Sequence, residues 1–254
     1  EIEQADIAIE NGKIVGFGEY DGEREFDITG KIAVPGLIDA HVHVESSQLS
    51  PEEFAKLVLP RGTTTIIADP HEITNVCGID GAKYVFDACA GTPLEAKVML
   101  PSCVPATAFE TSGATLDGAD TEKFIGEDFI HGLGEFMNYP GVIYKDSDVL
   151  KKLEAARAAN KVIDGHAPNT SGNGLNGYVC TGIQTDHECT SVDEALEKIS
   201  KGMYVHLREG SATRNVAQNC KAVNAMNLRR FIFCTDDRHA ADLQANGHLD
   251  NALR

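Results

Sequence analysis

The sequence predicts an α/β protein built as a (β/α)8 barrel of the TIM type and preceded by strands of a small β-sandwich. Eight short apolar runs recur along the chain, and most are separated by enough residues for a helix. Apolar strands that alternate with helices form parallel sheets, and eight such units close into a barrel. A doubly wound sheet would place a glycine-rich phosphate loop after its first strand, and the sequence has none there.

Short alternating segments at the start of the chain predict the strands of the β-sandwich. Residues 5–10 and 13–17 flank Asn11-Gly12, a dipeptide typical of tight hairpin turns. Residues 25–28 and 31–34 are expected to form a second strand pair around a turn at 29–30. Pro35-Gly36 ends this pattern, so we assign residues 1–34 to a partial N-terminal domain and residues 35–254 to the barrel.

The barrel strands are predicted from apolar runs that end in residues able to carry chemistry. They cover residues 36–41, 64–69, 96–101, 129–135, 161–166, 182–187, 202–207 and 230–236. Helix caps and apolar residues at helical spacing predict helices over 51–59, 146–159 and 191–201. Because the last strand is reached near Asp236 and the chain stops at Arg254, we expect the C-terminal end of the barrel to be truncated.

Composition and charge disfavour several classes of partner. The chain has 22 basic and 39 acidic residues, a net charge of −17, which argues against binding to nucleic acid or to an anionic membrane surface. No apolar run reaches the length of a membrane span. The 7 cysteines are scattered without a C-x-x-C pair, which favours a reducing, cytoplasmic location. An acidic surface does not forbid homo-oligomers, so the oligomeric state stays open.

Histidines and acids at the ends of the predicted strands indicate a metal site. His41 and His43 lie two residues apart on a strand and therefore point to the same side. Glu135 follows a glycine-rich strand end, and a carboxylate can bridge two cations through its two oxygens. His166 and His187 follow the fifth and sixth strands and complete a nitrogen and oxygen set suited to zinc, iron or manganese.

An acid at the end of the eighth strand is the candidate catalytic base. Asp236 can bind metal through one oxygen and take a proton from water with the other. Asp237 offers the same chemistry, because only the local register separates the two residues. We prefer Asp236 and keep Asp237 as the alternative.

Residues 35–43, Pro-Gly-Leu-Ile-Asp-Ala-His-Val-His, resemble the start of the barrel in the amidohydrolase superfamily. That motif is shared by many hydrolases. A longer and much more specific set of segments resembles the adenine deaminases of the bacterial and archaeal type. The segments are 41–47, 68–73, 100–107, 134–138, 164–168 and 234–238, which run through nearly the whole chain.

The resemblance implies a binuclear divalent metal centre, with manganese or iron first and zinc as a further candidate. His41 and His43 would hold one ion, His166 and His187 the other, and Glu135 would bridge them where many relatives carry a carboxylated lysine. The implied reaction converts adenine and water into hypoxanthine and ammonia. The cations would supply hydroxide at neutral pH, and Asp236 would move its proton. The ligands suit all three metals, so the metal identity stays open.

Other polar residues near the strand ends are candidates for substrate and proton contacts. His71 and Glu72 follow the second strand and are candidate catalytic residues. Four interpretations stay open: the pair shuttles protons, contacts the purine, holds an accessory metal, or is a hydrogen-bonded loop pair. Arg208 fits either an adenine contact or a structural ion pair. Residues 169–177, rich in Asn and Gly, are either a mobile lid or a turn-rich connection. The candidates for substrate binding are Glu45, Ser46, Ser102, Arg208 and Asp237.

Two rival functions stay open from the sequence. The same ligand set would serve hydrolysis of a cyclic amide or of another amide, and a panel of substrates would separate these reactions. A catalytically inactive fragment would bind two metal ions and turn over no purine, which kinetics would reveal.

Overall fold

The first compact unit contains an antiparallel hairpin. A computed structural model describes residues 3–254, and the chain divides into two units, Glu1–Pro35 and Gly36–Arg254. In the first unit, β1 (Asp6–Glu10) pairs with β2 (Lys13–Gly18) across the predicted turn. Asn11 and Gly12 have φ of 50° and 74°, the left-handed values that a tight hairpin turn requires at both positions. The hairpin prediction is therefore confirmed.

The prediction of a second strand pair in this unit is wrong. Residues 25–28 and 31–34 form no strand, although the turn between them exists, with the Lys31 N–H donating to Ile28 O at 3.0 Å. Phe26, Ile32 and Val34 are 73%, 65% and 69% exposed. Their alternating pattern therefore has no sheet to pack against within residues 3–254, and the backbone stays extended without a ladder.

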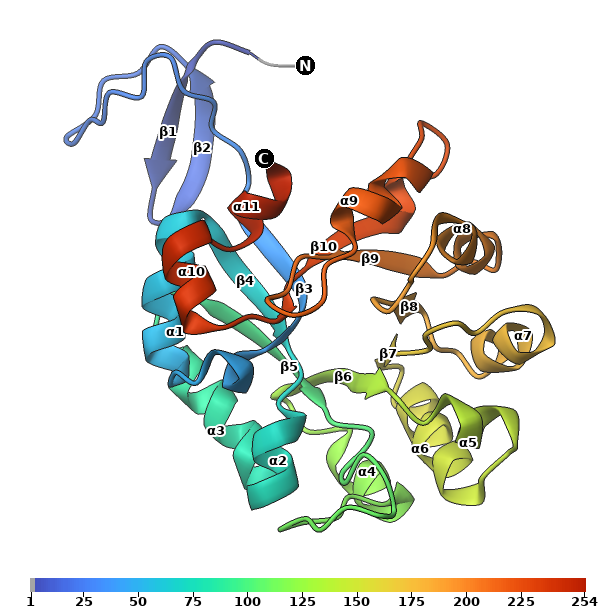
Figure 1. Cartoon of the computed structure of the whole chain (residues 1–254). Helices are drawn as coiled ribbons and strands as arrows, with labels where there is room; N and C mark the ends of the chain where they lie inside the picture. The colour runs from blue at the N-terminus through green and yellow to red at the C-terminus, as the bar shows by residue number, and fades with distance from the viewer. Residues whose placement is uncertain (1–2) are drawn as a thin grey trace. The chain divides into compact units, whose positions relative to one another are not determined.

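The second unit is an α/β structure with a curled parallel sheet (Figure 1). One parallel ladder has the order β11-β3-β4-β5-β6-β7 and another has the order β10-β9-β8. Strand β10 also lies against β3, and β8 lies against β7. Each predicted apolar run overlaps a strand, and the strand of the sixth run, β8, has only 2 residues. The strands are β3 (Leu37–His43), β4 (Thr63–Ala68), β5 (Glu95–Leu100), β6 (Ile130–Phe136), β7 (Val162–Gly165), β8 (Thr185–Asp186), β9 (Tyr204–Arg208), β10 (Phe231–Cys234) and β11 (Asp236–Asp237).

Helices connect the strands and lie outside the sheet (Figure 1). The three predicted helices are confirmed as α1, α6 and α8, and most of the segment 169–177 belongs to α7 rather than to an irregular loop. The α-helices are α1 (Pro51–Val58), α2 (His71–Cys77), α3 (Ile79–Ala90), α4 (Gly118–Phe124), α5 (Tyr139–Ile143), α6 (Ser147–Ala158), α7 (Gly172–Cys180), α8 (Val192–Ser200), α9 (Val216–Asn219), α10 (Ala240–Asn246) and α11 (Leu249–Leu253). Short 3₁₀ turns add η1 (Val44–Ser47), η2 (Leu59–Arg61), η3 (Cys220–Ala222) and η4 (Leu228–Arg230).

Helix α1 shows why these segments form where the sequence predicts them. The Ser50 side chain accepts a hydrogen bond from the Glu53 N–H, and Pro51 occupies the first turn, where no N–H partner is needed. Phe54, Ala55 and Val58 fall on one helical face and are buried. The cap fixes where the helix begins, and the apolar face fixes which side of the helix is buried, with α3 and α10 among its neighbours.

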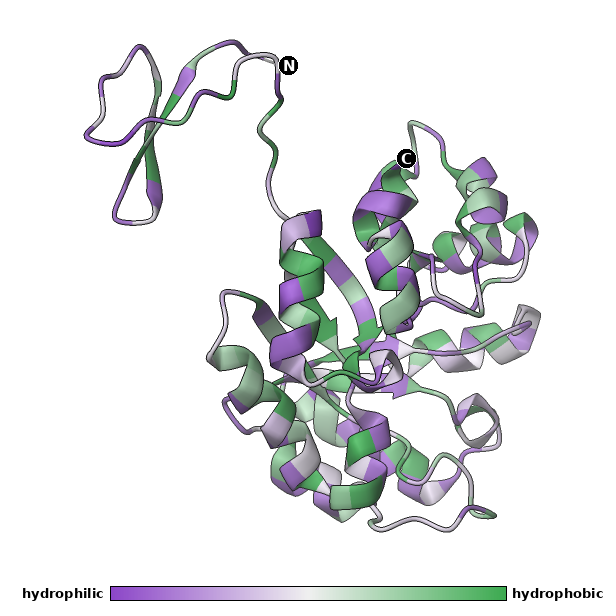
Figure 2. Cartoon of the chain, turned by 60° about the vertical axis from the view of Figure 1, so that its left-hand side comes forward, coloured by the Kyte–Doolittle hydropathy of each residue, from purple (hydrophilic) through white to green (hydrophobic). Residues whose placement is uncertain are grey.

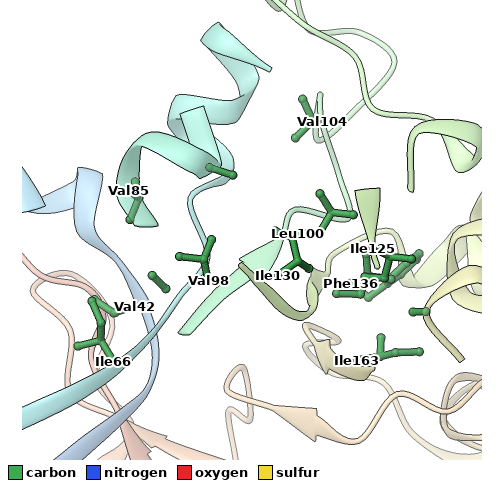
Figure 3. Packing of buried hydrophobic residues seen from close by; sticks show 14 of the residues in the cluster. Val42, Ile66, Val85, Val98, Leu100, Val104, Ile125, Ile130, Phe136 and Ile163 are labelled. Carbon is green, nitrogen blue, oxygen red and sulfur yellow. The ribbon is translucent and has the colours of Figure 1, made fainter. Parts of the chain in front are cut away.

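The core lies between the strands and the helices that surround them. Figure 3 shows Val42, Ile66 and Val98 from three neighbouring strands packed near Val85 of α3, and all four side chains are buried. In Figure 2 the helices carry purple residues beside green ones, as expected for helices with one solvated face. Among the helices of residues 3–254, none combines the length and the apolar character needed to cross a membrane.

Candidate metal centre

The predicted metal ligands lie where neighbouring parallel strands end. His43 is the last residue of β3, and Glu135 is the next to last residue of β6. His166 directly follows β7, and His187 directly follows β8. The carboxyl ends of parallel strands meet at one edge of the sheet, which explains why residues so far apart in the chain converge.

His41, His43 and Asp236 form the first group of donor atoms. The two Nε2 atoms are 3.1 Å apart, and Asp236 Oδ1 lies 3.4 Å from His41 Nε2 and 3.1 Å from His43 Nε2. All three residues are buried. Asp236 has a φ of 57°, in the left-handed region that is unfavourable for most residues other than glycine.

Glu135 connects the first group to a second one formed with His166 and His187. Its Oε1 lies 3.2 Å from His43 Nε2, whereas its Oε2 lies 2.6 Å from His166 Nδ1 and 3.2 Å from His187 Nε2. The His187 ring stacks on the His41 ring with 4.1 Å between centroids. One carboxylate thus directs each of its oxygens toward a different set of histidines.

The donor atoms of both groups fit divalent cations. Two ligand atoms that bind one cation at about 2.1 Å lie about 3.0 Å apart at a right angle and about 3.4 Å apart at a tetrahedral angle. The separations of 3.1 and 3.4 Å in the first group match this range. Neither ring nitrogen of the buried His187 has a hydrogen-bond partner among residues 3–254. The residues present therefore fit a pair of cations.

Hydrogen bonds on the far side of the imidazole rings fix their protonation. The His41 Nδ1–H donates to Asp164 Oδ2 at 2.8 Å, and the His43 Nδ1–H donates to the carbonyl oxygen of Asp69 at 2.7 Å. Carboxylate and carbonyl oxygens only accept, so both protons sit on Nδ1. When a cation binds, each ring must be neutral so that its Nε2 lone pair can face the cation, as in other histidine metal sites. Without metal, the raised pKa values of both rings favour a second proton on Nε2.

Asp69 and Gly134 support the position of Glu135. The Glu135 N–H donates to Asp69 Oδ2 at 2.7 Å. A Cβ atom added to Gly134 would lie 2.3 Å from that same oxygen, so a side chain at this position would displace Asp69. The glycine beside Glu135 is therefore needed for the close approach of the Asp69 carboxylate.

The acids and histidines of the cluster shift one another's pKa values. Burial by itself lowers the pKa of His41, but Asp164 and Asp236 outweigh it and hold the pKa well above its usual range. Burial likewise opposes the raised pKa of His43, which Asp236 and Glu135 produce. Burial by itself raises the pKa of Glu135, but the neighbouring imidazoles of His166, His187 and His43 outweigh it and hold the pKa well below the usual range. The acids are thus ionised at neutral pH and attract cations.

The structure separates the two candidate bases. Asp236 points to the histidines, and its Oδ2 accepts a hydrogen bond from Arg208 at 2.5 Å. Asp237 is exposed and accepts a hydrogen bond from the Ser46 hydroxyl. Arg208 also forms a two-point pair with Glu188, so its guanidinium already has two acid partners.

The other predicted contacts lie beside the centre. Ser102 is buried and donates to the carbonyl oxygen of Glu135 at 2.5 Å, so it supports the ligand rather than facing open space. His71 Nδ1 lies 3.4 Å from Glu135 Oε1, and Glu72 Oε2 lies 3.6 Å from His43 Nδ1. Glu45 accepts a hydrogen bond from the Ile73 N–H. The structure thus brings His71 and Glu72 to the metal centre.

A mostly apolar cavity adjoins Glu45 and Glu72. Its volume is about 370 Å³, and Val44, Leu49, Ile73 and Tyr84 are among its lining residues. Burial raises the pKa of Glu45 to about 7, and the nearby charge of Glu72 adds to this effect. A carboxyl group with a pKa of about 7 therefore lines this cavity, together with Glu72, whose Oε2 lies 3.6 Å from His43 Nδ1.

Several supporting residues were missed by the sequence reasoning. Asp164 and Asp69 lie inside segments that were singled out only for the neighbouring histidines. Lys198 is fully buried and donates to Asp186 Oδ2, Glu194 Oε1 and the Ala167 carbonyl oxygen at 2.8, 2.7 and 2.8 Å. In the sequence, Glu194 lies four residues before Lys198 on the predicted helix. Such pairs are common on solvated helix faces, so the spacing does not indicate that Lys198 is buried.

A parallel α/β sheet with a histidine and carboxylate cluster at its strand ends defines the class of metal-dependent hydrolases. The model of the amidohydrolase family matches residues 32–253. This chain belongs to the amidohydrolase family, and the family implies a divalent metal.

Curated relatives match the whole chain. It is 54% identical over 254 residues to a protein named adenine deaminase from Clostridium acetobutylicum, a match that covers 100% of this chain and 45% of the relative. It is 52% identical over 249 residues to an adenine deaminase from Methanoculleus marisnigri, covering 98% of this chain and 47% of the relative. The chain thus spans about half the length of the curated relatives it matches.

Solved structures share the fold at low sequence identity. An N-isopropylammelide isopropylaminohydrolase from Burkholderia multivorans has a TM-score of 0.57 at 16% identity, with 98% of this chain and 75% of that chain covered. A solved amidohydrolase has a TM-score of 0.56 at 14% identity, covering 93% of this chain and 76% of that chain. These likenesses concern the fold alone.

Proposed function

We propose that this chain carries the catalytic centre of an adenine deaminase, which converts adenine and water into hypoxanthine and ammonia. The observation that carries the proposal is the convergence of His43, His166 and His187 on the two oxygens of Glu135. His41 and Asp236 lie directly beside His43 in the same cluster. The relatives named adenine deaminase, at 54% and 52% identity, support the choice of substrate.

Two divalent cations, manganese or iron with zinc as the alternative, are assigned to this centre. His41, His43 and Asp236 would hold one cation, and His166 and His187 the other, with one oxygen of Glu135 directed to each. A bound pair of such cations lowers the pKa of water and supplies hydroxide at neutral pH. Nitrogen and carboxylate donors of this kind suit all three metals.

Asp236 is assigned the proton transfer. The water oxygen becomes bonded to the carbon that carries the exocyclic amine, and the carbon–nitrogen bond then breaks. One water proton ends on the purine ring nitrogen, and the other leaves with ammonia. Arg208 donates to Oδ2 of Asp236 and so keeps Oδ1 directed at the histidines. Asp236 at this place can accept and return a proton.

The cavity lined by Glu45 and Glu72 is assigned to the purine, because Glu72 also lies 3.6 Å from His43. Its volume of about 370 Å³ and its apolar lining are typical of a small-molecule pocket. Glu45 and Glu72 would face polar edges of the base, and His71 would exchange protons with it. Ser46, Ser102 and Asp237 stay substrate-binding predictions, although each has a protein partner of its own.

We also infer that the two parallel ladders belong to one eight-stranded barrel. The contacts of β10 with β3 and of β7 with β8 support this closure.

The exposed apolar side chains of the first unit, such as Ile9 and Phe17 at 67% and 62%, support its assignment to a small β-sandwich. A cytoplasmic location and homo-oligomer formation stay predictions.

Ammonia release from adenine by the manganese-loaded chain tests the proposed function. We expect turnover that depends on metal and is lost in His41→Ala and Glu135→Gln. His131→Ala is the matched control, because His131 lies on the same strand as Glu135 but is exposed. A folded chain that contains two metal ions and releases no ammonia from adenine would refute the proposal.

A further inference from the structure

One tyrosine hydroxyl joins the ends of two strands that carry metal-centre residues. Tyr178 lies on α7 and is fully buried. Its hydroxyl donates to the carbonyl oxygen of Phe136 at 2.9 Å and accepts from the His166 N–H at 2.9 Å. Phe136 directly follows Glu135 on β6, and His166 directly follows β7.

These two contacts lie on either side of the closest ligand pair in the centre. His166 Nδ1 and Glu135 Oε2 are 2.6 Å apart, and both belong to the donor set of the second cation. The ladder between β6 and β7 is irregular between Leu133 and Phe136, so regular sheet hydrogen bonds do not fix the strand separation there. The Tyr178 hydroxyl replaces them at the point where the ligands leave the sheet.

We propose that Tyr178 is a positioning residue for the second cation, whose hydroxyl sets the spacing between His166 and Glu135. The inference rests on the metal centre of the proposed function. Tyr178 contacts the carbonyl next to Glu135 and the backbone of His166, and it acts on the cation only through them. The His41 and His43 pair has separate supports, Asp164 and Asp69.

The chemistry of the hydroxyl suits this role. A phenol donates one hydrogen bond and accepts another, and Tyr178 uses both capacities on backbone groups. Burial raises the pKa of Tyr178 well above its usual range, so the hydroxyl keeps its proton over the working pH range. Phenylalanine would retain the buried ring and remove only the two hydrogen bonds.

Manganese binding measured site by site tests the inference. In a His41→Ala background only the second pair of histidines is intact, and in a His166→Ala background only the first pair is intact. We expect Tyr178→Phe to weaken manganese binding about tenfold in the His41→Ala chain, the low end of the range for lost ligand support. Binding in the His166→Ala chain should not change.

Tyr144→Phe is the matched control, because the Tyr144 side chain is 84% exposed and far less constrained. Equal weakening in both backgrounds would show a general structural role and overturn the inference, as would no weakening in either. Should Tyr178→Phe fail to fold, 4-aminophenylalanine at position 178 keeps a donor for Phe136, and its effect should again be confined to the second pair. A chain that binds manganese selectively in this way but does not deaminate adenine would refute only the proposed function.

Discussion

Replacement of Asp164 by asparagine should disable the first metal site without changing the size of the side chain. One carboxylate oxygen of Asp164 accepts from the His41 Nδ1–H, and the other accepts from the Gly165 N–H at 2.9 Å and from the Thr185 hydroxyl. The amide oxygen of asparagine should occupy the position of Asp164 Oδ1, where it accepts from the Gly165 N–H and the Thr185 hydroxyl. Its NH₂ group would then face His41 Nδ1, where two donors cannot pair.

The conflict is relieved when His41 moves its proton from Nδ1 to Nε2. Nε2, which faces His43 and Asp236, then carries the proton and can no longer bind a cation. A hydrogen bond to a charged group contributes about 1.5–3 kcal/mol. Loss of such a bond corresponds to roughly 10- to 100-fold weaker metal binding, the range seen when the partner of a ligating histidine is removed.

Manganese titration of the Asp164→Asn chain in the His166→Ala background measures this effect on the first site alone. The Asp87→Asn chain is the control, because Asp87 is exposed on α3 and pairs only with Lys83. Chemical denaturation without metal would verify that the variant is folded. Unchanged manganese affinity in folded Asp164→Asn would refute the argument from the His41 tautomer.

Three further outcomes are expected. Asp236→Asn should lose metal binding and turnover, whereas Asp237→Asn should keep metal binding, as dialysis and ammonia release would show. Lys198→Met should lower the free energy of unfolding by about 3–5 kcal/mol in urea denaturation, because Asp186 is left as a buried, unpaired charge. Glu45→Gln should be more stable than the parent above pH 7 when metal is removed. The carboxyl of Glu45, with its pKa raised to about 7, binds more protons folded than unfolded, so parental stability falls as pH rises from its ordinary pKa toward 7.

Matched variants make these outcomes decisive. Lys83→Met breaks an exposed pair with Asp87 and should cost less than about 1 kcal/mol. A Lys198→Met chain no less stable than Lys83→Met would contradict the role of the buried pair. Equal losses of metal in Asp236→Asn and Asp237→Asn would contradict the placement of the two acids. A stability profile of Glu45→Gln parallel to that of the parent between pH 5 and 8 would show that Glu45 titrates normally.

The convergence of the ligands could be predicted from the sequence because it depends on simple periodicities. His41 and His43 share a side because strand residues alternate, and Glu135, His166 and His187 meet because parallel strands end at one edge. These rules need only the strand positions. The strands predicted at 25–28 and 31–34 failed because alternation alone supplies no partner strand.

The partner of each polar side chain could not be read from the sequence in the same way. Arg208 and Asp237 both end strands near the centre, yet Arg208 pairs with Glu188 and Asp236, and Asp237 pairs with Ser46. The partner of each side chain depends on which groups of other loops come within about 3 Å of it. The periodicity of the sequence does not specify these distances. Lys198 is buried for the same reason, because carboxylates from another strand and from its own helix surround it.

The proposed bridging role of Glu135 has a consequence for how the metal centre assembles. Glu135 is complete when the chain leaves the ribosome, and both of its oxygens are already aimed at the histidine pairs. A carboxylated lysine in the same place would need carbon dioxide to add to its amine, and that addition is reversible. Assembly of this centre should therefore follow metal supply alone. Its rate should be the same in buffer stripped of bicarbonate as in buffer saturated with it.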